Sequence, residues 1–219
     1  GLAVNYATLR RVAAPDKRVA LVFSSYPTKY SRIGNAVGLD SPASMLTLLN
    51  ALRDNGYRIG DVPGLAAGDG DALMHALIER GGLDPDWLTD AQLADRAIRI
   101  PAAQYRQWFA TLPVELREAM ERHWGPAPGE MFVDRSRDPD GEIAVAAIQS
   151  ENIVILVQPP RGFGANPIAI YHDPDLPPSH HYLATYFWLR HGFGAHAVVH
   201  MGKHGNLEWL PGKSVGLSE

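Results

Sequence analysis

The sequence predicts an α/β protein in which helices flank a parallel sheet and a mostly helical subdomain is inserted. Val19–Phe23 is a continuous apolar run, the pattern of a strand buried on both faces. Further on, a strand at 153–158, a helix at 179–191 and a strand at 195–199 form a βαβ crossover, which should be right-handed with parallel strands. Residues 64–128 between these parts carry helical spacing. The arrangement is of the Rossmann-like or flavodoxin-like kind.

The first part of the α/β core is predicted over residues 1–63. The strand at Val19–Phe23 is followed by a long polar loop and then by a helix. Ser41 suits the N-cap of this helix, with Pro42 at its first position, and Gly56 suits its end. Strand, long loop and helix in this order open an α/β unit.

Helical segments dominate the middle of the chain. Glycine or proline separates them, and they cover 71–80, 90–98, 102–111 and 114–123. We interpret residues 64–128 as a helical insertion, which could serve as a lid or as scaffold.

The second part of the core is predicted over residues 129–219. Ile143–Ile148 and Ile153–Gln158 have strand character, and Ser179 suits the N-cap of a helix that Gly192 closes. In open parallel sheets, ligands bind beyond the carboxyl ends of the strands. Three segments leave those ends, at 24–40, 159–178 and 200–210. We therefore expect them to converge on one crevice.

Composition excludes several kinds of chemistry. Cysteine is absent, so any metal must bind nitrogen or oxygen. The net charge of −4 comes without a dense basic run, which makes nucleic acid a poor partner. The sequence contains no P-loop for ATP hydrolysis and no Gly-x-Ser-x-Gly motif. Neither a membrane-length apolar run nor a leader pattern is found, and we expect a cytoplasmic protein without a membrane span.

The strongest local signal is the stretch from His200 to Glu208. Two imidazoles and a carboxylate, those of His200, His204 and Glu208, follow a strand at intervals of four residues. Such a set suits a divalent first-row metal and leaves coordination positions open. Glu208 could instead accept protons, and a solvated loop without a ligand is the simpler alternative. Gly202 and Gly205 would allow a sharp turn and close approach of a ligand.

Three other groups of residues could contribute to a site. His180 and His181 open the helix capped by Ser179, where the positive helix end disfavours protonation and keeps imidazoles ready to bind or accept protons. Arg161 lies in a Pro- and Gly-rich loop and could pair with a ligand carboxylate. The loop after the first strand offers Tyr26, Lys29 and Arg32 to a planar acidic ligand. Each group could equally be structural or merely solvated. If they are functional, we expect all three groups to face the block that begins at His200 across the same crevice.

Four blocks resemble the large subunit of aerobic cobaltochelatases of the CobN type. They are VALVFSSYPTKYSRIGNAVGLD at 19–40, QPPRG at 158–162, SHHYLATYFWL at 179–189 and HMGKHGNLEWLPGKSVGL at 200–217. The large subunit of magnesium chelatase shares the frame of the last block. It typically has Thr, Ser, Phe and Met where this chain has Lys203, Asn206, Trp209 and Leu210, so these four positions favour the cobalt branch.

The resemblance implies insertion of Co²⁺ into hydrogenobyrinic acid a,c-diamide, a tetrapyrrole, with this chain an internal portion of a much longer subunit. ATP would be hydrolysed, with Mg²⁺, by separate AAA+ partner subunits. His200, His204 and Glu208 would hold the metal, and Glu208, His204, His180 or His181 would act catalytically, for instance by accepting pyrrole protons. The candidates for binding the ring are Tyr26, Lys29, Arg32, Arg161, Lys203, Trp209 and Lys213. Mg²⁺ insertion into protoporphyrin and a non-catalytic tetrapyrrole-binding module are the alternatives.

Overall fold

The computed structural model describes residues 2–25, 33–34, 36–80, 98–162, 173, 175–203 and 210–211. The helices within these ranges are α1 (Leu2–Arg11), η1 (Ala14–Asp16), α2 (Ser41–Asp54), α3 (Gly70–Glu79), α5 (Ala102–Phe109), α6 (Val114–Trp124), α8 (His180–Phe187) and the π-helical turn η4 (Trp188–Gly192). The strands are β1 (Val19–Phe23), β2 (Ile98–Pro101), β3 (Val133–Asp134), β4 (Glu142–Val145), β5 (Ala147–Ser150), β6 (Ile153–Val157) and β7 (Ala197–Met201).

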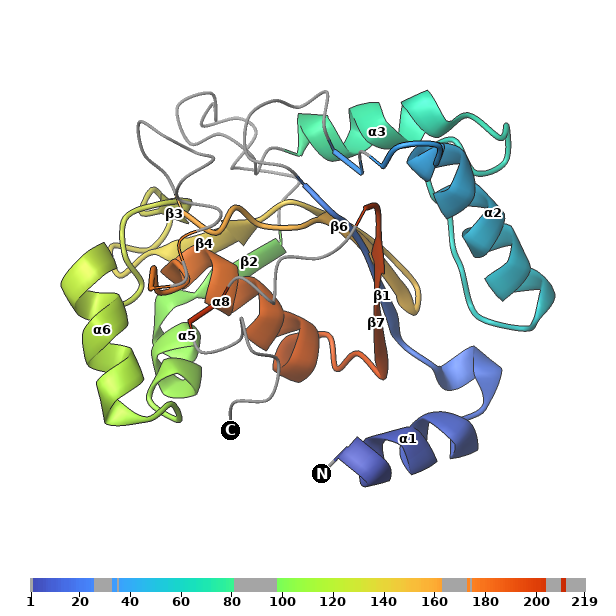
Figure 1. Ribbon diagram of the computed structural model, residues 1–219. Coiled ribbons are helices and arrows are strands. Elements are labelled where there is room, and N and C mark those ends of the chain that lie inside the picture. The colour runs from blue at the N-terminus through green and yellow to red at the C-terminus, as the bar shows by residue number, and fades with distance from the viewer. Residues whose placement is uncertain are drawn as a thin grey trace.

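The main sheet has the strand order β5-β6-β1-β7 (Figure 1). β1 pairs in parallel with β6 on one side and with β7 on the other, which confirms the predicted parallel core. β6 and β7, the two strands of the predicted crossover, are parallel but not adjacent, because β1 lies between them. β5 adds an antiparallel edge through a tight hairpin with β6.

Helices cover both faces of this sheet, as the sequence of β1 requires. Val19, Leu21 and Phe23 point into a core shared with α2 and α3. Ala20 and Val22 point into a second core with residues of η4 and the segment after it. All five residues of β1 are buried. The sheet is therefore the central layer, with α2 and α3 on one side and α8 on the other (Figure 1).

A second, antiparallel sheet of three strands in the order β2-β4-β3 lies next to α5, α6 and α8. Ile100, Tyr105, Phe109, Met120 and Ile143 form its core together with Val145 and Ala184. Because Ala184 lies on α8 and Leu189 on η4, this helical segment contacts the cores of both sheets.

This second sheet corrects two details of the sequence interpretation. Ile143–Ile148 is predicted as one strand, but it is divided between β4 in the small sheet and β5 in the main sheet. Within 64–128, the expected helices are present as α3, α5 and α6, yet Ile98–Pro101 is a strand. α3 packs on α2, whereas α5 packs on β2 and α8. The expected segment 90–98 lies almost wholly outside the described residues, and the boundaries at 64 and 128 stay a prediction.

Side-chain caps begin three of the helices. The Asp40 carboxylate accepts a hydrogen bond from the Ala43 N–H at 3.0 Å and caps α2 in place of the expected Ser41. The Ser41 hydroxyl is instead used to donate to the Gly34 carbonyl. Ser179 does cap α8 as predicted, accepting from the Tyr182 N–H at 3.2 Å. The chain from Ser179 onward is thus fixed at the start of the helix that carries His180 and His181.

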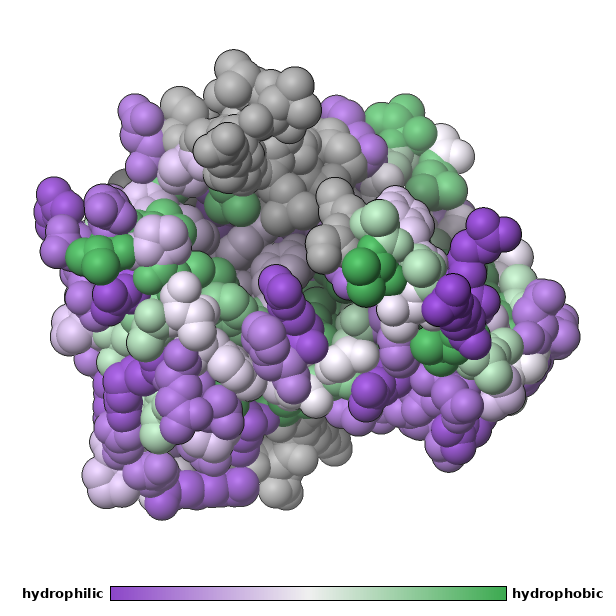
Figure 2. Space-filling model, turned by 90° about the horizontal axis from the view of Figure 1, so that it is seen from below, coloured by the Kyte–Doolittle hydropathy of each residue, from purple (hydrophilic) through white to green (hydrophobic). Residues whose placement is uncertain are grey.

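The face seen from below Figure 1 is largely hydrophilic (Figure 2). Hydrophilic residues cover the side of the molecule where α6 lies, and hydrophobic residues are scattered among them. β7 forms one edge of the main sheet and leaves Val198 and Val199 exposed. In the described part of the chain, no helix combines the length and apolar character needed to cross a membrane.

Candidate functional site

The carboxyl ends of three strands meet at one edge of the main sheet. Phe23, the last residue of β1, lies opposite Val157 of β6 and Met201 of β7. The pairing extends past the strands, since the Gln158 N–H donates to the Phe23 carbonyl and the Ser24 N–H to the Met201 carbonyl, both at 2.8 Å. The ends of β1, β6 and β7 therefore lie side by side. The convergence of the segments at 24–40, 159–178 and 200–210 on one crevice stays a prediction, because much of each segment lies outside the described residues.

His200 lies at this edge within a small polar network. Its Nε2 is 3.5 Å from the hydroxyl of Tyr186 on α8. The buried Gln158 donates from its side-chain amide to the same hydroxyl at 3.3 Å. Burial raises the pKa of Tyr186, so the phenol stays protonated and uncharged. The Tyr186 hydroxyl thus approaches the His200 ring at this edge of the sheet, and the Gln158 amide supports that hydroxyl.

The turn after β7 packs tightly against the turn after β1. Gly202 has φ +144°, and a Cβ at this position would collide with the Ser24 hydroxyl. Only glycine fits this close approach. From the sequence, Gly202 is expected to allow close approach of a ligand. In the structure it allows close contact between the turn after β7 and the turn after β1. Lys203 follows it and is exposed.

Most of the predicted ligands of metal and ring lie outside the described residues. These are Tyr26, Lys29, Arg32, His204, Glu208, Trp209 and Lys213. Among the residues that the structure does describe, no three His, Asp or Glu side chains gather in a way that could hold a metal ion. The roles assigned to His200, His204 and Glu208 therefore stay predictions.

Arg161 is buried and serves the loop that carries it. Its guanidinium is fully inaccessible, and Nη2 donates to the carbonyls of Asp173 at 2.7 Å and Leu176 at 2.9 Å. These bonds tie the beginning of the Pro-rich segment to its end. The predicted contact between Arg161 and a ligand carboxylate would require this segment to open, and it stays a prediction.

His180 is enclosed by hydrogen bonds. Its Nε2 lies 2.9 Å from the Gly125 carbonyl, which can only accept, so Nε2 carries the proton. Nδ1 then accepts from the Tyr105 hydroxyl at 2.8 Å. The ring also packs edge-on against Tyr105 and Phe109. Burial lowers the pKa of His180, which agrees with a neutral ring at the helix start.

His181 differs from His180 in the hydrogen bonding of one ring nitrogen. Its Nε2 donates to the Ala144 carbonyl at 3.0 Å, but its Nδ1 is buried and has no hydrogen-bond partner in the described structure. The Phe132 ring lies against it, with centroids 4.2 Å apart, and Phe132 has the unusual backbone φ of +59°. Burial lowers the pKa of His181 to about 4. At neutral pH this imidazole is uncharged and a weak base.

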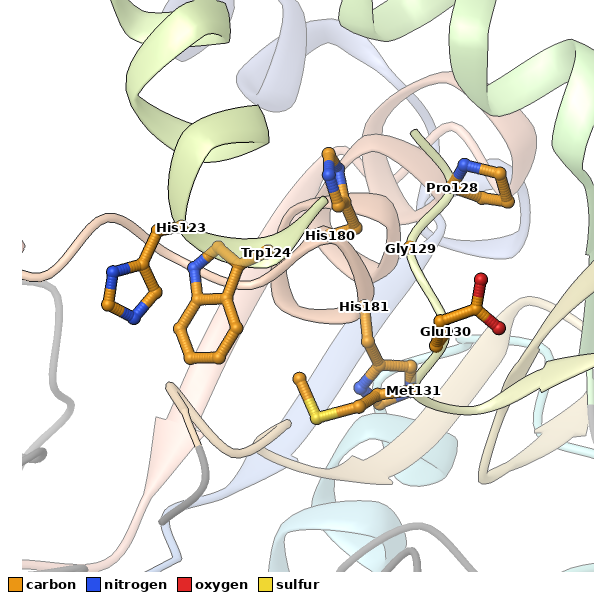
Figure 3. Close-up of a pocket in the computed structure, with 8 residues that line it drawn as sticks. All are labelled: His123, Trp124, Pro128, Gly129, Glu130, Met131, His180 and His181. Atoms are coloured by element: carbon orange, nitrogen blue, oxygen red, sulfur yellow. The ribbon is translucent and has the colours of Figure 1, made fainter. Parts of the chain in front are cut away.

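The two histidines line a pocket of about 270 Å³ between α6 and the start of α8 (Figure 3). The remaining lining residues are His123, Trp124, Pro128, Gly129, Glu130 and Met131. The described contacts of His180 and His181 are thus with α5, the 125–132 loop and β4, whereas Tyr186 faces His200. The expectation that His180 and His181 face the same crevice as His200 does not match these contacts.

Sequence reasoning missed Tyr186, Gln158 and Tyr105 as partners of the histidines. Tyr186 and Gln158 lie within the recognised blocks at 179–189 and 158–162, and Gln158 directly follows a strand end. That position was a usable signal. Nothing local marks Tyr105, because it meets His180 only through packing of the middle segment on α8.

Comparison with known proteins agrees with the fold and with the recognised blocks. The family model for CobN/Magnesium Chelatase matches residues 1–219. The chain belongs to this family of metal chelatase large subunits.

Within the family, the chain is similar to proteins of both branches. It is 45% identical to the aerobic cobaltochelatase subunit CobN of Pseudomonas aeruginosa over 99% of its length, which is 16% of that protein. It is 32% identical to a magnesium-chelatase subunit of Chlorobaculum parvum over 99% of its length, again 16% of that protein. The chain thus spans about a sixth of the relatives that it matches.

A solved structure shares the fold. The catalytic subunit of cobaltochelatase from Mycobacterium tuberculosis superposes with a TM-score of 0.83 and is 62% identical, over 99% of this chain and 17% of that chain. The mixed α/β architecture described above is therefore shared with a segment of that catalytic subunit.

Proposed function

We propose that this chain is part of the large subunit of a cobaltochelatase, the subunit that binds tetrapyrrole and metal and inserts Co²⁺ into hydrogenobyrinic acid a,c-diamide. One observation carries the choice of cobalt. Identity is 62% and 45% to proteins named for cobalt insertion but 32% to a protein named for magnesium insertion. Lys203, Asn206, Trp209 and Leu210 point to the same branch.

The metal is assigned to His200, His204 and Glu208. A hydrated Co²⁺ must exchange water for ring nitrogens, and imidazole and carboxylate ligands can replace part of its water shell. The position of His200 supports this role, because its ring is held at the carboxyl edge of the sheet by Tyr186.

The ring is assigned to the cationic and aromatic residues of the same edge. Lys29, Arg32, Lys203 and Lys213 would pair with its acidic side chains, and Tyr26 and Trp209 would contact its flat face. Lys203 is exposed directly after β7, which is the position that this role requires. Arg161 would join them only after its loop opens.

Two pyrrole protons must leave when the metal enters. We assign their acceptance to Glu208, with His204 beside it. His180 and His181 are weaker candidates than the sequence suggested, since burial lowers the pKa of both imidazoles. The energy of insertion would come from ATP hydrolysed, with Mg²⁺, by separate ATPase subunits, as the resemblance to the CobN type implies. The 219 residues of this chain contain no P-loop of their own.

Magnesium insertion into protoporphyrin is the second candidate, because the magnesium branch belongs to the same family. Absorbance titration of the intact large subunit with the corrin precursor and with protoporphyrin separates the two. We expect a spectral shift and tight binding with the corrin precursor alone. Binding of protoporphyrin alone would assign the chain to the magnesium branch, and binding of neither ring would contradict both.

The metal site is tested by His204→Ala and Glu208→Ala in the intact protein, assayed for Co²⁺ insertion with the partner ATPase subunits. His75→Ala is the matched control, since His75 is exposed on α3 and has no role in the assigned site. We expect loss of insertion in the first two variants with ring binding retained. Full insertion activity in both variants would show that the assigned site is wrong. If the variants lost both ring binding and insertion, the result would favour the alternative in which the chain is a tetrapyrrole-binding module.

A further inference from the structure

The His181 ring holds a hydrogen-bond acceptor that is not used by any residue in the described part of the chain. The Ala144 carbonyl can only accept, so the 3.0 Å contact places the ring proton on Nε2 of His181. Nδ1 must then carry the lone pair, and it is buried without a hydrogen-bond partner in the described structure. The adjacent His180 shows the usual outcome, with both nitrogens paired.

A pocket is built directly against this ring. Trp124, Met131, Pro128 and the faces of the two imidazoles give it mostly apolar walls, and its volume is about 270 Å³. In Figure 3 the His181 ring lies near Met131, and one of its nitrogens faces the side on which Trp124 lies. Met131 is half-buried and unbranched, so it can move to admit a ligand to Nδ1.

The walls of the pocket are held in place. The Trp124 indole donates to the Pro177 carbonyl at 2.9 Å. Gly129 has φ +76°, and a Cβ there would come within 3.0 Å of the His180 ring, so the loop can approach the histidines only with glycine at this position. Phe132 closes the far side of His181. These walls of the pocket are therefore in place before any ligand arrives, and Met131 is the lining side chain that moves.

The lone pair of His181 selects against an anion. A ligand carboxylate has no proton to donate to it. The lining carboxylate of Glu130 is largely exposed and is paired with Arg135 at 2.9 Å, so it adds little net charge to the pocket. Because burial lowers the pKa of His181 to about 4, the ring stays an acceptor throughout the neutral range.

A metal ion fits the pocket less well than a neutral donor. In the ranges described, no three potential His, Asp or Glu ligands come together. Glu130 is already paired with Arg135. The His123 ring packs edge-on against Trp124, with ring centroids 4.4 Å apart. A cation would find one nitrogen ligand among apolar walls. A neutral N–H group needs only that one acceptor.

We propose that this pocket binds an uncharged carboxamide carried on a flat, apolar body, with the amide N–H donating to Nδ1 of His181. The apolar body lies against Trp124 and Met131. The ligand is a small molecule, or one side arm of a larger one, and its carboxylate analogue is rejected. This site is separate from the sheet edge at His200, and it is tested without ring, metal or partner subunits.

Benzamide and benzoate form a matched pair of probes, equal in shape but with a neutral donor in one and an anion in the other. Their dissociation constants for the intact large subunit are measured by ligand-observed NMR. We expect benzamide to bind at least tenfold more tightly than benzoate. His181→Phe keeps a ring against Phe132 but removes the acceptor, and it should weaken benzamide binding at least tenfold.

Two further variants keep the test decisive. His191→Phe makes the same replacement at an exposed histidine C-terminal to α8, outside the pocket, and should leave benzamide binding unchanged. Met131→Trp leaves His181 in place but fills the pocket, and should abolish benzamide binding even if His181→Phe does not fold. Equal binding of the two probes, no binding of benzamide to the wild type, or unchanged benzamide binding in Met131→Trp would overturn the proposal.

Discussion

The burial of His181 predicts a loss of stability in mildly acidic solution. The ordinary pKa of histidine, 6.5, applies to the unfolded chain, whereas burial lowers the pKa of His181 to about 4 in the folded protein. Below pH 6.5 His181 is therefore protonated in the unfolded chain, whereas in the folded chain it stays neutral until about pH 4. The stability is complete above pH 6.5 and is lost as the pH falls through this window.

The size of the effect follows from the two pKa values. Proton linkage gives a loss of about 2 kcal/mol between pH 7.5 and pH 5, rising to about 3 kcal/mol at pH 4. His180 adds a loss of the same sign, because burial lowers its pKa as well. Asp134, whose pKa is lowered to about 2 by hydrogen bonds from Ser136 and Arg99, begins to contribute only below about pH 4. The window from pH 7.5 to 5 therefore reports on the histidines.

Urea unfolding of the 219-residue chain, followed by tryptophan fluorescence at several pH values, measures the loss. His181→Gln should be less stable than the wild type at pH 7.5, yet its stability should fall by about 2 kcal/mol less between pH 7.5 and 5. His75→Gln, at an exposed position on α3, should keep the wild-type slope. NMR titration adds a direct check, because the His181 ring signals should not move between pH 8 and 5. A titration midpoint near 6.5 would refute the burial argument and the neutral acceptor inferred from it.

Three further predictions concern the sheet edge and its supports. Tyr186→Phe should weaken Co²⁺ binding by about 10- to 100-fold in calorimetry of the intact protein, because it removes the hydroxyl that orients His200; Tyr57→Phe is the control, and equal affinities would contradict the assignment. Gly202→Ala should lower the free energy of unfolding by about 2 kcal/mol or more, since its Cβ would collide with Ser24. Gly38→Ala should cost less, because open space surrounds that position, and an equal loss would show that the close approach does not matter. Arg161→Met should destabilise the fold by about 3 kcal/mol in thermal unfolding, because it removes charge-assisted bonds to two loop carbonyls, and an unchanged midpoint would contradict the loop-holding role.

The sequence is sufficient to predict a structural feature where one side chain or one short run of residues determines that feature. The apolar run Val19–Phe23 has no polar face, so only a strand covered on both sides suits it. Ser179 had a helix directly after it to cap. At Asp40 and Ser41, two capping residues stand next to each other. The choice depended on the distant Gly34 carbonyl, which takes the Ser41 hydroxyl, and no local pattern contains that information.

Strand partners were harder to predict for the same reason. Both halves of Ile143–Ile148 are mostly buried and apolar, so their side chains read as one continuous strand. The partners differ, since β4 pairs with β2 and β3 while β5 pairs with β6. Pairing is decided by segments up to about fifty residues away, here Ile98–Pro101, and hydrophobic periodicity does not record it.

The same limit explains the two histidine sites on α8. The sequence placed His180, His181 and His200 together because the helix and the strand end were both expected at the crevice. Successive helical residues turn by about 100°, so His181 and Tyr186 point about 140° apart around the axis and are separated by about 7.5 Å along it. His181 accordingly reaches Ala144 of the small sheet, while Tyr186 reaches His200 of the main sheet. α8 therefore lies between the predicted metal edge and the pocket. A ligand bound at His200 and a ligand that donates to Nδ1 of His181 would occupy different sides of this helix.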